Sequence, residues 1–287
     1  MARGRAMQET GRNDAGHADA GQSAGVEHAL VTGASSGIGA AIAREYARRG
    51  VPLVLSARRV ERLEALASEL RKHVAVECIA ADLADPAAPA RLQAELAARG
   101  IAVSRLVNNA GYGVPGRFLS SDWPVHRDFM QVLVGSVLEL THRLLPAMEA
   151  AGHGCILNVA SLAGLVPASA GHTLYGASKA FVIRFSESLA RETAGRGVHV
   201  TALCPGMTWT EFHDVNGMRE RVSRLPRWLW MDAASVARLG VDAVERGDAR
   251  CVPGATNRML AGLSKYLPER LARALLESRS RDFRDAD

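Results

Sequence analysis

The alternation of short apolar runs with amphipathic helical segments constrains the fold of this chain more than any other feature. It starts at His28 with an apolar run, a glycine-rich turn and a helix that carries Ile38 and Ile42 on one face. Further strands are expected at 52–57, 74–80, 103–109, 155–161, 198–204 and 249–252, and helices at 60–72, 89–99, 124–150, 173–194 and 233–246. Strands that alternate with helices form a parallel sheet. We therefore predict an α/β fold with one doubly wound parallel sheet of about seven strands.

One domain is expected to hold most of the 287 residues. Residues 1–25 are rich in glycine, alanine and polar residues without apolar periodicity, so we expect a disordered tail. Residues 26–255 form the predicted domain, and residues 256–287 a C-terminal helical extension. Leu260 and Leu263 share one helical face there. A basic amphipathic end of this kind can lie on an anionic membrane surface, but we expect it to pack on the same domain.

Composition excludes several classes of protein. The net charge of +5 and the pI of about 9.3 come from arginines spread over many helices, without an aromatic-interleaved basic cluster, so no nucleic-acid partner is expected. No apolar run approaches the ~20 residues of a membrane helix. The histidines show no metal-ligand spacing, and no metal is expected. The four cysteines are far apart in or beside strands, which favours a reducing, cytoplasmic location.

The first strand is followed by a glycine turn typical of a dinucleotide site. Gly33 permits the tight turn, Gly37 lets the backbone approach a ligand, and Gly39 allows close packing of helix on strand. The next helix then offers free N–H groups to a pyrophosphate. Glycines are common in loops, but between a first strand and a first helix this spacing is strong support for a dinucleotide.

Two later strand ends bear on the choice of dinucleotide. Arg58 and Arg59 stand where a site for NAD(H) would hold a carboxylate, and a guanidinium can bind a 2′-phosphate instead. This favours NADP(H) over NAD(H), although two arginines can also simply solvate the loop. Asp82 and Leu83 follow the third strand. Asp82 is placed to contact an adenine edge or to act as a helix N-terminal carboxylate, and the sequence leaves both open.

The stretch from Ser161 to Lys179 carries the reactive groups. Tyr175 and Lys179 lie one helical turn apart in the sequence YGASK, so an ammonium can favour the phenolate and lower the tyrosine pKa. Ser161 ends an apolar strand and is placed to hydrogen-bond a substrate oxygen. A lone pair of this spacing can also be a solvated helix face, and only the other motifs decide between the two interpretations.

Taken together, the motifs resemble the short-chain dehydrogenase/reductase family over about residues 28–254. They are TGASSGIG, Asp82-Leu83, Asn108-Asn109-Ala110-Gly111, Ser161, YGASK, and Pro205-Gly206 with Thr210. The resemblance implies a Rossmann-type fold, an NAD(P)-dependent carbonyl reductase or alcohol dehydrogenase, and a homodimer or homotetramer. We favour the dimer, because the C-terminal extension is expected to block one of the family's usual interfaces. It assigns carbonyl orientation to Ser161, proton donation to Tyr175, and ribose binding with pKa control to Lys179. The cofactor contacts implied are Gly33, Ser35, Ser36, Gly37, Ile38, Gly39, Arg58, Arg59, Asp82, Leu83, Asn109, Ala110, Gly111, Tyr175, Lys179, Pro205, Gly206, Thr208 and Thr210.

Two departures from the family pattern affect the expected activity. Leu133 stands where the family has an asparagine, whose carbonyl holds a relay water and whose side chain supports a helix distortion. We expect slower turnover, and Ser136, about one turn on, is a possible substitute. Ser161 also precedes Tyr175 by 175 − 161 = 14 residues, one more than usual, so the loop through Pro167 carries an extra residue.

The region after Gly206 corresponds to the family's substrate lid and is rich in apolar and aromatic side chains. We expect the lid to include Met207, Trp209, Phe212, Trp228 and Trp230. Such a lid favours a small hydrophobic carbonyl or alcohol substrate, lipid-like compounds included, although these residues can also bury into the lid's own core or a subunit interface. The alternative function is a catalytically weakened NADP(H)-binding protein with a protein or membrane-surface partner.

Overall fold

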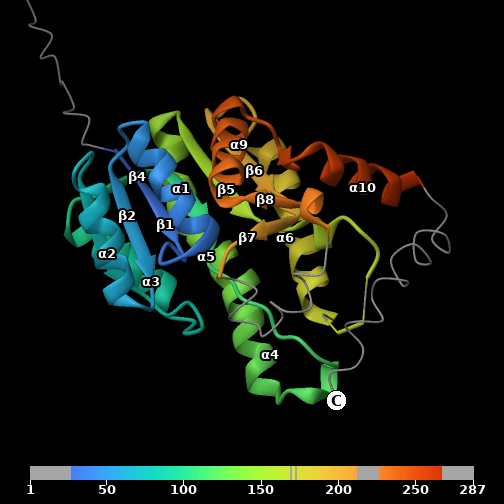
Figure 1. Ribbon diagram of the computed structural model, residues 1–287. Coiled ribbons are helices and arrows are strands. Elements are labelled where there is room, and N and C mark those ends of the chain that lie inside the picture. The colour runs from blue at the N-terminus through green and yellow to red at the C-terminus, as the bar shows by residue number, and fades with distance from the viewer. Residues whose placement is uncertain (1–26, 169, 172, 212–225, 267–287) are drawn as a thin grey trace, which may run out of the picture.

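A seven-stranded parallel sheet forms the centre of the protein (Figure 1). The computed structural model describes residues 27–168, 170–171, 173–211 and 226–266. Within them the strand order is β3-β2-β1-β4-β5-β6-β9, which confirms the predicted doubly wound Rossmann-type α/β fold. The strands are β1 (Glu27–Thr32), β2 (Leu53–Ala57), β3 (Val76–Ala80), β4 (Ala102–Asn108), β5 (Gly154–Val159), β6 (Val198–Leu203) and β9 (Arg250–Cys251).

Helices cover both faces of this sheet and create two cores. One core joins α1 and α9 to the sheet through residues such as Ile42 and Val241, and the other joins α3, α5 and α6 through Leu92, Leu140 and Leu189. Because both faces are covered, β2 and all of β1 after Glu27 are buried instead of alternating between buried and exposed positions. The helices are α1 (Gly37–Arg48), α2 (Val60–Leu70), α3 (Ala88–Ala98), α4 (Trp123–Met130), α5 (Ser136–Ala151), α6 (Thr173–Glu192), α9 (Ala233–Arg246) and α10 (Ala255–Tyr266).

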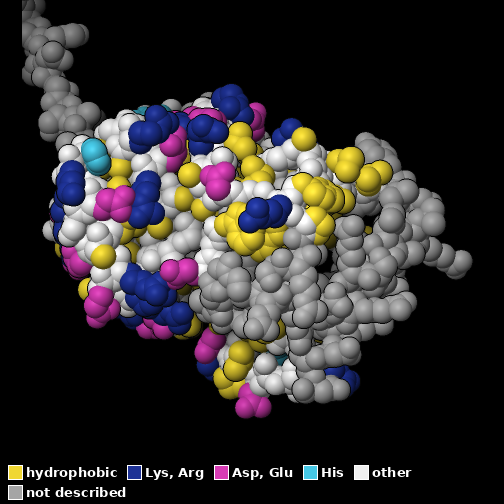
Figure 2. All heavy atoms as spheres, in the orientation of Figure 1, with side chains coloured by type: hydrophobic (Ala, Val, Ile, Leu, Met, Phe, Trp, Pro, Cys, Tyr) yellow, Lys and Arg dark blue, Asp and Glu magenta, His cyan; other side chains and the backbone are white. Residues whose placement is uncertain are grey.

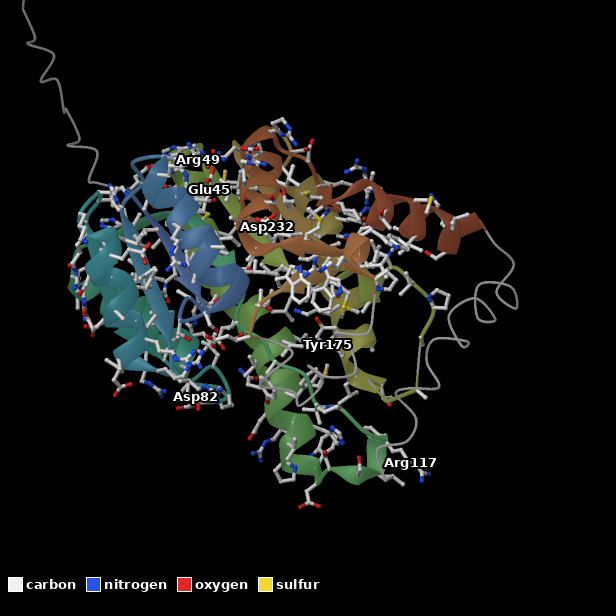
Figure 3. The ribbon with its side chains drawn as sticks, in the orientation of Figure 1. Glu45, Arg49, Asp82, Arg117, Tyr175 and Asp232 are labelled. Atoms are coloured by element: carbon white, nitrogen blue, oxygen red, sulfur yellow. The ribbon has the colours of Figure 1, made fainter. Side chains whose placement is uncertain are left out.

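The strand order reverses beside β1, and this switch point positions the site. β1 pairs in parallel with β2 on one side and with β4 on the other. The connections therefore leave the carboxyl ends of β1 and β4 in opposite directions, and ligands of open α/β sheets bind in the crevice that results. Asp82 and Tyr175 lie at this end of the molecule, whereas Glu45 and Arg49 lie at the other (Figure 3).

The helix expected at 124–150 is present but is not uniformly α-helical. A π-helical segment, η2 (Gln131–Gly135), separates α4 from α5. Inside it Leu133 is buried in the core, and the Ser136 hydroxyl donates a 2.8 Å hydrogen bond to the carbonyl oxygen of Val132. The expected helix is therefore confirmed in its extent, and it contains one π-helical turn.

A second sheet, of two strands, lies near the site. β7 (Met207–Trp209) pairs in parallel with β8 (Trp230–Asp232), and the Trp209 and Trp230 rings stack with centroids 4.0 Å apart. The short η4 (Arg227–Leu229) precedes β8. Phe212, the expected tail at 1–25 and most of the expected C-terminal extension lie outside the described residues.

Candidate active site

A cavity of about 910 Å³ opens at the carboxyl ends of the strands. Most residues that the motifs single out line it, although they come from the ends of six different strands and from α6. They are Gly33, Ser35, Ser36, Gly37, Ile38, Arg58, Arg59, Asp82, Leu83, Asn109, Ala110, Gly111, Ser161, Tyr175, Lys179, Pro205, Gly206, Met207, Thr208 and Thr210. Gly39 and three expected lid residues, Trp209, Trp228 and Trp230, do not line it.

The glycine turn leaves room for a ligand and supplies donors to it. Gly33 and Gly37 have backbone φ angles of 64° and 58°, values that residues other than glycine rarely adopt. No side chain among the described residues caps α1, so the amides of its first turn face the cavity without an intrahelical acceptor. An uncapped helix start of this kind is suited to a phosphate.

Gly39 serves the packing of this turn instead of the cavity. A Cβ at that position would overlap the amide nitrogen of Asn109, which donates to the carbonyl oxygens of Thr32 at 2.9 Å and Gly33 at 3.1 Å. The Thr32 hydroxyl in turn accepts from the backbone N–H of Asn109 at 3.0 Å. Asn109 therefore holds the glycine turn against the end of β4, and only a glycine at position 39 leaves space for it.

The Arg59 side chain lies against the glycine turn. Its Nη2 donates to the hydroxyls of Ser35 and Ser36 at 3.0 Å each, and Arg58 lines the same part of the cavity. A guanidinium held between two hydroxyls is placed to bind a phosphate at the adenosine end. Asp82 accepts from the backbone N–H of Ala84 at 3.1 Å, before α3 begins, so its carboxylate stabilises a turn and not a helix start.

Ser161 and Tyr175 are in hydrogen-bond contact despite the extra loop residue. Ser161 follows β5, and its Oγ also accepts from the backbone N–H of Ala163 at 3.1 Å. Gly164 brings this segment onto α6, because a Cβ there would lie 2.6 Å from the backbone nitrogen of Ala180. The glycine three residues after the serine thus sets the distance between the serine and the helix that carries the tyrosine.

Lys179 is buried beneath Tyr175. Its Nζ donates to the carbonyl oxygen of Val159 at 2.8 Å and lies 5.8 Å from the centroid of the Tyr175 ring. Burial lowers the pKa of Lys179 to about 8. Burial also raises the pKa of Tyr175, while its hydrogen bond to Ser161 acts in the opposite direction. The expectation that the tyrosine pKa falls below its usual value is therefore not met, and the Tyr175 hydroxyl keeps its proton at neutral pH.

Comparison with known proteins identifies the family. The family model described as short chain dehydrogenase matches residues 27–220. The chain belongs to this family. It is 42% identical over 188 residues to a sulfoacetaldehyde reductase of Chromohalobacter salexigens, which covers 64% of this chain and 73% of the relative. It is thus an oxidoreductase of the short-chain dehydrogenase/reductase type.

Solved structures of the family cover more of the chain. A short-chain dehydrogenase from Sphingobium yanoikuyae in complex with NADPH is 34% identical, with a TM-score of 0.74, and covers 91% of this chain and 97% of its own. A bulky-bulky ketone specific alcohol dehydrogenase from Comamonas testosteroni is 29% identical, with a TM-score of 0.69, and covers 91% and 96%. The likeness therefore extends past the segment that the family model matches.

The missing family asparagine leaves the helix distortion in place. Leu133 is 1% exposed and faces the core, with its side chain 3.8 Å from where a Cβ on Gly111 would lie. The Ser136 hydroxyl donates to the Val132 carbonyl within η2, so Ser136 supports the distorted helix. The hydroxyl is used within the helix, and Ser136 does not line the cavity.

Several cavity residues escaped the motif analysis. Tyr112 extends the wall after Gly111, and its ring packs edge-on against the Phe129 ring, with the two centroids 5.5 Å apart. Glu211 lines the cavity and pairs with Arg62 of α2. Asn257 and Leu260 come from a helix without any motif. Tyr112 had a sequence signal, since it directly follows the Asn-Asn-Ala-Gly motif, and Leu229 stands between Trp228 and Trp230 of the expected lid.

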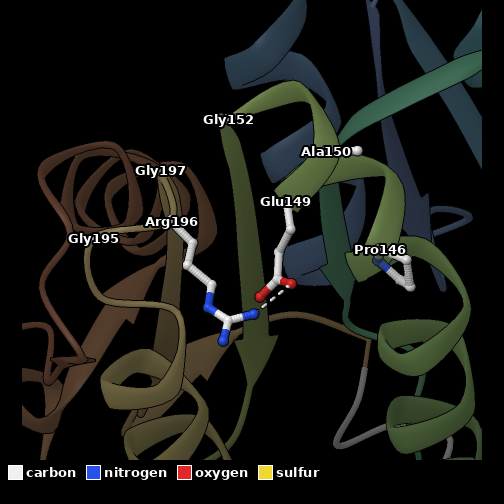
Figure 4. A pocket seen from close by; sticks show the side chains of 7 residues that line it. All are labelled: Pro146, Glu149, Ala150, Gly152, Gly195, Arg196 and Gly197. Carbon is white, nitrogen blue, oxygen red and sulfur yellow. Dashed lines mark hydrogen bonds and ion pairs between the residues drawn. The ribbon is translucent and has the colours of Figure 1, made fainter.

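A second hollow, of about 780 Å³, lies near the amino ends of β5 and β6, at the other end of the strands from the first cavity (Figure 4). It is formed by the end of α5 and the turn before β6, and Glu149 pairs with Arg196 across it at 3.0 Å. No motif residue reaches it. Among the described residues no group of three or more His, Cys, Asp or Glu side chains is arranged for a metal, and no helix is long and apolar enough to cross a membrane.

Proposed function

We propose that this protein reduces an apolar ketone or aldehyde to an alcohol, or runs the reverse oxidation, with NADP(H) preferred over NAD(H). The single observation that carries the proposal is the hydrogen-bonded pair of Ser161 and Tyr175 in a cavity whose other end holds Arg59. One end thus offers a proton donor, and the other a cation for a phosphate.

The residues present fit a dinucleotide with a 2′-phosphate. The uncapped start of α1 and the open backbone at Gly37 suit the pyrophosphate, and Arg59 with the Ser35 and Ser36 hydroxyls suits the 2′-phosphate. The NADPH complex of the Sphingobium relative supports this choice. When bound, the nicotinamide supplies the hydride.

The chain's own residues control the oxygen of the substrate. Ser161 and Tyr175 orient the carbonyl by hydrogen bonds and stabilise the negative charge that develops on its oxygen. Tyr175 then gives that oxygen a proton, which its raised pKa keeps available at neutral pH. Lys179, fixed by the Val159 carbonyl, places a buried donor directly behind the tyrosine.

The walls near Tyr175 favour an apolar substrate. Leu162, Val166, Met207 and Leu229 line this part of the cavity. Among the described lining residues the arginines, Arg58 and Arg59, belong to the glycine-turn end and not to this one. At this end a sulfonated aldehyde, as in the name of the Chromohalobacter relative, would find one cation among the described lining residues, Lys179, which already donates to the Val159 carbonyl. A bulky ketone, as in the name of the Comamonas relative, needs no cationic partner.

The noncatalytic alternative finds no support in the described geometry. It was motivated by Leu133 and the lengthened loop, yet the helix distortion is present and Ser161 still meets Tyr175. The cytoplasmic location and the homodimer or homotetramer stay predictions. Contact of the C-terminal end with a membrane surface also stays untested, because most of that segment lies outside the described residues.

Steady-state kinetics with two cofactors and two substrate classes test the proposal. We expect NADPH-dependent reduction of aryl ketones with kcat/KM at least tenfold above that for a sulfonated aldehyde, since a buried unpaired charge is rejected strongly. Tight NADPH binding without turnover on either class would contradict the enzymatic proposal. Turnover of the sulfonated aldehyde alone would contradict the substrate class and leave the reaction type standing.

The cofactor preference has its own test. Arg59→Glu is expected to lower the affinity for NADPH by about 100-fold and to leave the affinity for NADH within about threefold, because one charge-assisted contact becomes a repulsion. Arg44→Gln is the matched control, since Arg44 pairs with Glu69 on the surface away from the cavity. Equal losses of affinity for NADPH and NADH would show that Arg59 supports the turn and does not bind the 2′-phosphate.

A further inference from the structure

Helix α10 reaches the cavity although no motif predicts it. Asn257 and Leu260 line the cavity, but the family match ends at residue 220. The two residues are three apart, so they share one face of the helix. Met259 and Leu263, which do not line the cavity, are 57% and 45% exposed. Apolar side chains are visible at the surface of α10 (Figure 2). The helix therefore presents a definite inner face to the site.

Asn257 fixes the start of this helix to the loop after β6. Its side chain is 3% exposed, and its Nδ2 donates to the carbonyl oxygen of Pro253 at 2.7 Å. A Cβ on Gly206 would overlap the Asn257 side-chain oxygen, so the amide packs directly on the Gly206 backbone. The first turn of α10 is thus held against the loop that flanks the catalytic end of the cavity.

The last turn of α10 is held by a second loop. The one hydroxyl hydrogen of Ser264 is shared between the carbonyl oxygens of Leu165 and Ala261, each 2.9 Å from Oγ. Leu165 belongs to the segment that follows Ser161. α10 therefore bridges the two loops on either side of Tyr175. Because it is attached at both ends, residues between these attachments have little freedom to move outward.

Leu260 lies between these attachments and faces apolar neighbours. It packs with Leu229, Trp230 and Met207. Met207 and Leu229 line the cavity themselves, while Trp230 is braced from behind by the stacked Trp209. The Trp pair thus acts as a support for the wall, and Leu260 is the part of α10 that enters the substrate end.

We propose that Leu260 determines which substrates fit, by setting the width of the apolar compartment beside Tyr175. This inference rests on the proposed reduction of apolar carbonyl compounds. A smaller side chain at position 260 enlarges the compartment and admits larger ketones, whereas a larger one excludes them. The attachments at Asn257 and Ser264 prevent the helix from closing or opening the space in compensation.

Selectivity between two ketones tests the proposal. The measured quantity is the ratio of kcat/KM for benzophenone, which has two aryl groups, to that for acetone. Leu260→Ala is expected to raise this ratio about tenfold and Leu260→Phe to lower it about tenfold, the range that a few methylene groups can produce. Leu263→Ala is the matched control, because Leu263 lies one turn further along the same helix, is 45% exposed and does not line the cavity. Its ratio should stay within about twofold. An unchanged ratio in both Leu260 variants overturns the inference.

A binding measurement separates this inference from the reaction itself. Isothermal titration of the NADP⁺-loaded protein with benzhydrol reports the width of the compartment without turnover. We expect Leu260→Phe to weaken benzhydrol binding about tenfold and Leu263→Ala to leave it unchanged. If no ketone is reduced but this shift is observed, the proposed reaction fails and the inference stands. If the unmodified chain does not bind benzhydrol up to its solubility limit, or binding is the same in all variants, the inference is wrong.

Discussion

The cofactor end and the substrate end of the cavity are built in different ways. At the cofactor end each wall is a short sequence motif at the end of a strand, as with Gly33 after β1 and Arg58 after β2. At the substrate end the walls are single side chains from distant segments, such as Val166, Leu229 and Leu260. The first end requires a fixed backbone path, whereas the second requires only apolar volume.

This difference explains where motif reasoning reached the site and where it did not. A backbone that approaches a phosphate needs glycine at particular positions, so the requirement is visible in the sequence. An apolar wall can be made by any large aliphatic side chain that the fold brings near. Trp209 and Trp230 looked suited to the wall, but they stack on each other behind it.

Tyr175→Phe removes one hydroxyl at the junction of the two ends and should have the largest effect. We expect kcat to fall roughly a thousandfold, because the proton donor is lost, with NADPH affinity within about threefold. Tyr46→Phe is a matched control, since the Tyr46 hydroxyl is buried without a hydrogen-bond partner among the described residues. It should leave turnover unchanged and stabilise the fold by about 1 kcal/mol in urea unfolding. Normal turnover in Tyr175→Phe would remove this residue from the mechanism.

Gly39→Val tests whether the cofactor end depends on backbone packing. The new side chain would overlap Asn109, so we expect a loss of roughly 3 kcal/mol in the free energy of unfolding and a large loss of NADPH affinity. Gly262→Ala is the control, because nothing lies within 4 Å of its Cβ position in α10. It should stabilise the protein slightly. Intact NADPH binding in Gly39→Val would show that the turn tolerates displacement.

Lys179 gives the site a pH dependence of stability. Burial lowers its pKa from 10.5 to about 8, so between these values the unfolded chain binds a proton that the folded chain does not. Stability should therefore rise with pH across this window, by up to roughly 3 kcal/mol. Urea unfolding of the unmodified chain and of Lys179→Met measures this slope, which the variant should lose. A slope that persists in the variant would assign it to other groups.

Ser136→Ala probes the distorted helix behind Leu133. Without the hydroxyl the Val132 carbonyl loses its 2.8 Å partner, and we expect kcat to fall about fivefold with a loss of about 1 kcal/mol in stability. Leu133→Asn restores the family residue and should raise kcat if the relay limits turnover. Parallel measurements of kcat and of urea unfolding separate the two effects. An unchanged kcat in Ser136→Ala would confine this residue to a structural role.

Trp209→Leu should have the smallest effect on activity. Its ring is 44% exposed and stacks on Trp230 instead of lining the cavity, so kcat/KM for an aryl ketone should change by about threefold or less. Leu229→Ala, which alters a lining residue, should change it more. A larger change in kcat/KM for Trp209→Leu than for Leu229→Ala would show that Trp209 contacts the substrate. That result would weaken the contrast between the two ends.

The sequence by itself determined the fold and the cofactor end. Alternating apolar and amphipathic segments require a parallel sheet covered on both faces, and Gly33, Gly39 and Asn109 carry packing requirements that few other residues meet. Ser161 and Tyr175 followed from the same motifs, since Gly164 fixes the approach of their segments.

Only the tertiary structure decided the substrate end. Leu260 lies 260 − 175 = 85 residues after Tyr175, and its place beside the cavity depends on hydrogen bonds made by Asn257 and Ser264. The raised pKa of Tyr175 likewise comes from burial, which one turn of helical spacing to Lys179 does not reveal. Burial and long-range contact depend on how whole elements pack, and a local pattern of residues does not carry that information.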